Sequence, residues 1–297
     1  MKNFVHPDSI VRKIWQHTDV VLFIFGASAG EFALHKVVDW LFFTGKLPAD
    51  PIGRLFSTVV YAQKIIFEEE DKALKTLQMM AQIHKGVEEA RGFSIPNWAY
   101  QDVLYMLIAH SITCYELWER PLSEEEKAEV YAVFKRVGQG MGLQELPENY
   151  EAWLLAREEH LTNHFEKSVF SIQLFDAYQQ QLGTLSYWLL CEIQKVLLPT
   201  ALKRLLYENT RQPIRFIPKE SNPICATKAI RFPKPYIFVP NGNTTTHTRI
   251  FVQLYKLVKP IYPFYLVRYW LLPKEHRPLL ADMEKRMKNA TDNNALI

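Results

Sequence analysis

Residues 69–91 read EEDKALKTLQMMAQIHKGVEEAR, and their apolar side chains recur at the three- and four-residue spacing of an α-helix. The apolar face of this helix consists of Leu74, Leu77, Met80, Ala81, His84 and Val87. The segment is therefore predicted to be an amphipathic helix with a histidine on its core-facing side. Such an imidazole is either a hydrogen-bonded core residue or a metal or haem ligand, and the periodicity alone favours the core residue.

The same periodicity continues on both sides of this helix. Further helices are predicted in residues 8–43 (two or three of them), 54–67, 98–118, 124–137, 150–164 and 168–207. Asp8 or Ser9 is a plausible N-cap for the first, and Ser123 with Glu126 has the spacing of a capping box. Glycines and prolines mark connections at residues 44–53 and glycines mark another at 138–147. The fold class is thus all-α, with the whole chain, residues 1–297, forming a single domain.

The C-terminal third departs from this pattern. Residues 209–248 contain six prolines among short β-branched and aromatic runs, which predicts a long irregular excursion. Residues 250–272 are apolar but interrupted by lysines, prolines and Arg268, so they are not a membrane span. We expect a buried terminal helix there, the alternative being peripheral contact with a membrane surface.

Composition narrows the class of protein. The chain has 48% hydrophobic residues and a formal net charge of +3 without any basic block, so it can bury a large core and is not expected to bind nucleic acid. Three widely spaced cysteines favour neither a disulfide framework nor a zinc site. The N-terminus lacks the apolar core of a secretory signal. A cytoplasmic location is the expectation.

Few residues suggest chemistry by themselves, because the chain has no dinucleotide-binding, P-loop, zincin or nucleophile-elbow motif. His35 and His110 lie in predicted apolar helices and are expected to be core residues. His160 and His164 are one helical turn apart and could chelate a metal, but the charged residues around them favour a chance pair on a solvated face. Arg54 and Thr58 share one helical face with Tyr61, which is more simply explained by capping and packing.

Four segments occur in an order that resembles a known family. They are DSIVRKIWQHTDVVLFIFGASAGEFALH (8–35), DPIGRLFST (50–58), MMAQIHKGV (79–87) and RPLSEEEKAEVY (120–131). Together they resemble the oxygenases that include the MpaB enzymes and the catalytic domain of latex-clearing proteins (rubber oxygenases). The resemblance covers most of residues 8–208 and implies a globin-like haem-binding helical core with additional N- and C-terminal helices.

The resemblance also implies site residues. His84 matches the family's proximal ligand of haem b, and Arg54, Ser57 and Thr58 match a segment over the distal face, with Ser57 where the latex-clearing branch has a lysine. Arg54 and Thr58 are then the predicted catalytic residues, donating hydrogen bonds to dioxygen. Glu31 and Asp39 are the nearest candidates for a distal acid.

The function implied is a haem b-dependent oxygenase that uses dioxygen to cleave or otherwise oxidise a lipophilic, unsaturated small molecule. Because the expected location is inside the cell, a small substrate of the MpaB kind is favoured over rubber. Two alternatives stay open: a non-enzymatic haem or lipid carrier, and a haem-free helical scaffold.

Overall fold

The computed structural model describes residues 2–43, 45, 49–208 and 277–294, and these residues form an all-α fold, as predicted. Its helices are α1 (Ile10–Trp15), α2 (Thr18–Ala33), α3 (Asp39–Phe43), α5 (Pro51–Phe67), α6 (Glu70–Arg91), α7 (Asn97–Trp118), α8 (Glu124–Gly140), α9 (Tyr150–Asn163), α10 (Val169–Leu197), α11 (Thr200–Lys203), the π-helical turn η1 (Arg204–Glu208) and α14 (Arg277–Asn294). Within the described residues, β-structure is limited to two isolated bridges.

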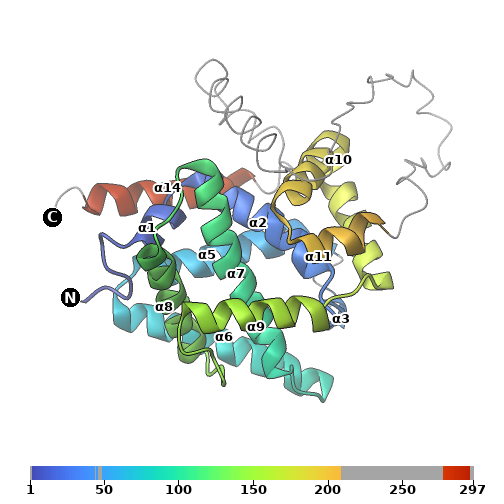
Figure 1. The fold of residues 1–297 in the computed structure, drawn as a ribbon, viewed down its shortest axis with the longest axis horizontal. Helices are drawn as coiled ribbons and strands as arrows, with labels where there is room; N and C mark the ends of the chain where they lie inside the picture. Colours follow the sequence, from blue (N-terminus) through green and yellow to red (C-terminus); the bar gives the residue numbers. More distant parts are fainter. Residues whose placement is uncertain (1, 44, 46–48, 209–276, 295–297) are drawn as a thin grey trace.

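Helix α2 is central to the fold and packs against α7 and α10 (Figure 1). Most of its side chains are buried, which explains why its sequence shows an almost continuous apolar run and not a single apolar stripe. Trp15 of α1 is fully buried and its indole N–H donates to Ser111 of α7 at 3.2 Å. One core therefore joins the N-terminal helices to the middle of the chain.

The crossing of α2 and α10 depends on two glycines. A Cβ atom on Gly30 would lie 2.7 Å from the side chain of Gln194, and one on Gly26 would lie 3.2 Å from Ile193. The buried Gln194 amide donates to the carbonyl of Gly26 at 3.2 Å. Helix α10 reaches this crossing after a kink at Gly183, whose φ of 72° favours glycine.

Helix termini agree with the capping residues predicted from the sequence. Ser9 accepts a hydrogen bond from Val11 N at the start of α1, and Ser123 and Glu126 form the expected capping box of α8. The prediction that α8 ends at Val137 is wrong, because the helix runs to Gly140. Glycine is favoured at position 138 of this helix, because the side chain of any other residue would collide with Leu104.

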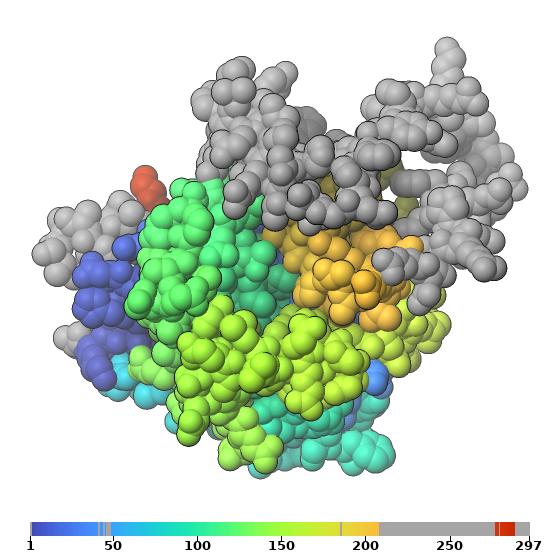
Figure 2. Space-filling view, in the orientation of Figure 1, coloured from blue at the N-terminus to red at the C-terminus, as the bar shows by residue number. Residues whose placement is uncertain are grey.

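Helix α14 agrees with the expectation of an additional C-terminal helix, although its residue range was not predicted, and it packs against α5. Residues 209–276, which include the predicted proline-rich excursion and the 250–272 segment, lie outside the described residues. None of the helices in the described parts of the chain is long and apolar enough to cross a bilayer. Figure 2 shows the face on which α9 lies, in yellow-green, with α11 beside it in amber.

Candidate functional site

His84 lies in the middle of α6 with its imidazole in one defined orientation. Its Nδ1–H donates to the carbonyl oxygen of Met80, one helical turn earlier, at 2.7 Å. Because Nδ1 carries the proton, the lone pair is on Nε2, the atom that a haem iron or a metal ion would bind. The side chain is only half-buried, so a ligand can approach Nε2 from outside the core.

The surroundings keep this imidazole neutral. Burial lowers the pKa of His84, the hydrogen bond to Met80 opposes this, and the positive charge of Arg54 lowers it further. The ring of Tyr100 meets His84 edge-on, with the ring centroids 5.4 Å apart. Tyr100 is itself fixed, because its hydroxyl donates to Glu88 at 3.0 Å. A neutral imidazole with an available Nε2 is the form that can coordinate a metal.

The three residues predicted on the distal side lie on α5, which packs against α6. Arg54 is exposed, and its guanidinium makes no hydrogen bond or ion pair with another residue that the structure describes. The hydroxyls of Ser57 and Thr58 both donate to the backbone carbonyl of Arg54, at 2.7 and 3.2 Å. Arg54 therefore retains its donors, whereas each hydroxyl would have to rotate away from the helix before it could donate elsewhere.

Apolar side chains lie beside His84 on the same helix. Met79 and Ile83 occupy the row next to that of Met80 and His84, and they are 41% and 45% exposed. Large apolar side chains with this exposure, next to an available imidazole nitrogen, suit contact with an apolar ring system or substrate.

Both candidates for a distal acid are engaged in ion pairs. Asp39 accepts from Arg91 at 2.6 Å. Glu31 is fully buried and bonds to Arg157 on α9 and, at 3.0 Å, to His110 on α7. Burial raises the pKa of Glu31, but Arg157 and His110 outweigh this and the pKa is lowered, so the carboxylate is ionised. We call Glu31, His110 and Arg157 the Glu31 network.

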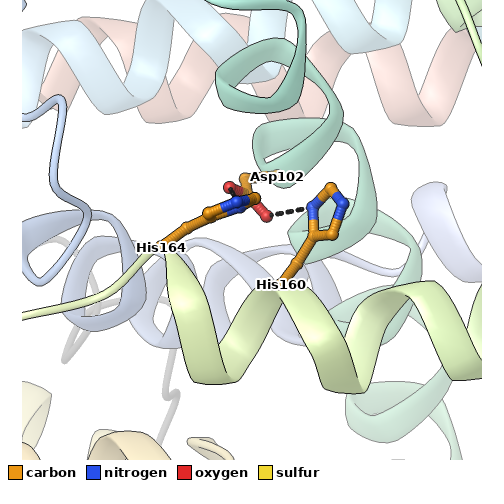
Figure 3. Close-up of side chains that lie close together, drawn as sticks. All are labelled: Asp102, His160 and His164. Carbon is orange, nitrogen blue, oxygen red and sulfur yellow. Dashed lines mark hydrogen bonds and ion pairs between the residues drawn. The ribbon is translucent and has the colours of Figure 1, made fainter.

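A second buried carboxylate lies between α7 and α9. Asp102 accepts from His35 Nε2 at 2.9 Å, from His160 Nδ1 at 2.8 Å and from His164 Nδ1 at 2.7 Å. Figure 3 shows His160 and His164 rising from α9 towards Asp102 on α7. Burial raises the pKa of Asp102, but its bonds with His160 and His35 lower it to about 2. We call these four residues the Asp102 cluster.

Comparison with known proteins identifies the family. The family model described as "ER-bound oxygenase mpaB/B'/Rubber oxygenase, catalytic domain" matches residues 13–214, more than half of the chain. The chain belongs to this family. No curated protein and no solved structure matches it.

Membership of the mpaB/rubber oxygenase family confirms the resemblance inferred from the four sequence segments, and with it oxygenase as the broad class. The matched region contains every residue predicted for the haem site. The structure brings Arg54 and His84 together on adjacent helices and within electrostatic range.

Two features of this mpaB/rubber oxygenase domain differ from the predictions. His35 is buried as expected, but it lies beyond the end of α2, in a bridge with Phe165. His160 and His164 are not on a solvated face, since Arg157 beside them is buried and their side chains are only 14% and 19% exposed. Asp102 was missed altogether, although a carboxylate inside the apolar run of residues 98–118 was a signal that it has buried partners.

Proposed function

We propose that this chain is a haem b-dependent oxygenase that oxidises a lipophilic, unsaturated small molecule, with His84 as the axial ligand. The observation that carries the proposal is the 2.7 Å bond from His84 Nδ1–H to Met80, which leaves Nε2 as the free ligand atom. A ligand histidine in haem and metal proteins characteristically donates its second N–H to a carbonyl or carboxylate in this way. Haem b bound there would supply the dioxygen chemistry of an oxygenase.

The residues of α5 have distinct roles in this proposal. Arg54 offers a guanidinium without a partner in the described part of the chain, so it can donate to an anionic group or to dioxygen next to His84. Thr58 and Ser57 would contribute only after their hydroxyls leave the Arg54 carbonyl, which holds them at 3.2 and 2.7 Å. Arg54 is therefore the main polar group of this segment, in which Ser57 stands where the latex-clearing branch has a lysine.

The lipophilic character of the substrate is supported by the apolar side chains around the imidazole. Met79 and Ile83 present apolar surface beside His84, and burial of such surface favours a substrate with little polarity. Unsaturation of the substrate is an expectation from the mpaB/rubber oxygenase family.

The test is the visible spectrum of the chain purified from cells supplied with a haem precursor. Wild type should show a Soret band, His84→Ala should lose stoichiometric haem, and His6→Ala, a change at an exposed histidine, should retain it. Added imidazole should restore haem binding to His84→Gly. A haem-free wild type, or full haem in His84→Ala, would overturn the proposal. If haem is present without oxygen-dependent turnover of any unsaturated lipophilic compound, the carrier alternative replaces the enzyme.

A further inference from the structure

We propose that Asp102, His160 and His164 form a second metal site, separate from His84, for a divalent first-row transition-metal ion. One ligand atom from each of the three residues lies within 4.8 Å of the other two. Two imidazoles and one carboxylate are the ligand set of many zinc and non-haem iron sites. The inference does not rest on the proposed haem function, because none of these residues takes part in it.

The first argument is the charge of the cluster. Asp102 is 1% exposed, and the ion pairs that it makes within the described residues are with imidazoles only. The other buried carboxylate, Glu31, has the permanent cation Arg157 as a partner. Among the described residues no lysine or arginine pairs with Asp102, and buried carboxylates are usually either paired with such a cation or bound to a metal ion.

His35 is the third imidazole that bonds to Asp102, and it is more deeply buried than the two proposed ligands. Its Nε2–H donates to Asp102, while its buried Nδ1 has no hydrogen-bond partner in the described part of the chain. The His35 ring packs against the rings of Phe32 and Phe165, with centroid distances of 6.2 and 5.2 Å. His35 is thus a positioning residue that orients the carboxylate, the role that outer hydrogen-bond partners have around metal ligands.

The second argument is that the ligands are held in place before any ion binds. His160 is in the last turn of α9 and His164 caps that helix. The segment is fastened to the end of α2 by backbone bonds from Lys36 N to His164 O at 3.0 Å and from Glu166 N to Leu34 O at 2.8 Å. A fixed backbone lowers the entropy that metal binding would otherwise cost.

The third argument is size and access. The two Nδ1 atoms lie 2.7 and 2.8 Å from the carboxylate oxygens. Tetrahedral zinc with bonds of ~2.0–2.2 Å needs ligand atoms roughly 3.3–3.6 Å apart, so the side chains would have to separate by under about 1 Å. The partial exposure of His160 and His164 gives an ion a route from solvent, and three protein ligands leave a coordination position open.

The experiment uses the full chain, freed of metal with a chelator and titrated with Co²⁺, whose visible d–d bands report coordination by nitrogen and oxygen. We use the haem-free His84→Ala background next to wild type, so that haem absorption does not mask the bands. One tightly bound cobalt per chain is expected in both, displaced by Zn²⁺. His164→Ala and Asp102→Asn should weaken binding by at least about 100-fold and His35→Phe by about 10-fold.

His6→Ala is the matched control, because His6 lies 3.7 Å from Asp8 on the surface and is the kind of pair that binds ions adventitiously. It should leave cobalt affinity unchanged. The site assignment is wrong if wild type binds no cobalt, if His6→Ala or His84→Ala abolishes binding, or if His164→Ala binds as wild type does. Should a ligand variant fail to fold, the wild-type melting temperature decides: excess Zn²⁺ must raise it, and no rise would refute the site.

Discussion

Replacing Arg157 with methionine leaves the Glu31 carboxylate buried without its permanent cation. Glu31 is fully buried and the Arg157 side chain is 6% exposed, so neither charge is solvated in the native state. Breaking a buried pair by removing one partner costs about 3–5 kcal/mol. For a domain of this size each kcal/mol lowers Tm by about 2–4 °C, so Arg157→Met should lower Tm by roughly 6–20 °C.

The assay is thermal and urea unfolding followed by circular dichroism, with a double variant as the decisive comparison. In Glu31→Gln/Arg157→Met neither charge is present, and the double variant should therefore be more stable than Arg157→Met alone. Lys72→Met is the control, since it breaks an ion pair at a side chain that is 61% exposed and should cost under about 1 kcal/mol. The single variant Glu31→Gln completes the comparison. The reasoning is refuted if the unfolding free energy of Arg157→Met lies within about 1 kcal/mol of that of wild type, or if the losses of unfolding free energy in the two single variants add up to the loss in the double variant.

Two further predictions concern stability. Gly30→Ala should destabilise by about 1–3 kcal/mol because its Cβ would meet the buried Gln194 side chain 2.7 Å away, whereas Gly86→Ala, with nothing within 4 Å, should stabilise by about 0.5–1 kcal/mol in the same urea titration. Hydrogen bonds from Arg120 and from the backbone N–H of Ser123 lower the pKa of Glu126 to about 2, so its contribution to stability is present above pH ~4.5 and is lost as the pH falls towards 2. The stability difference between wild type and Glu126→Gln should narrow over this range, and a pH-independent difference would contradict the assignment.

Apolar spacing and capping residues predicted most helices of residues 8–207, because helix formation and capping depend on residues that are close together in the sequence. The capping box at Ser123 and the helix that carries His84 follow from spacing alone, but the predicted apolar face of that helix is not a core face, since of its six residues only Leu77 is buried and Leu74 is 38% exposed. The Asp102 cluster does not, because its histidines are between 58 and 67 residues away from the carboxylate and periodicity carries no information on such pairs. The same limit applies to the end of α8, where Gly138 packs closely against Leu104, a residue distant in the sequence.

The position of the engaged hydroxyls on α5 was also beyond sequence reasoning. Thr58 and Ser57 were correctly predicted to share a helix with Arg54, but whether a side chain points into a site or bonds back to its own helix depends on a rotamer.

The wide sequence separation of the Glu31 network has a consequence for synthesis on the ribosome. Glu31 and Arg157 are 126 residues apart, so at about 5–20 residues per second α2 is made roughly 6–25 s before its arginine partner exists. During that interval Glu31 has no permanent cation to pair with, although α7, a main packing partner of α2, is already made. The last residue of the two buried networks is His164. A nascent chain must therefore expose its first 164 residues outside the exit tunnel before this core can close.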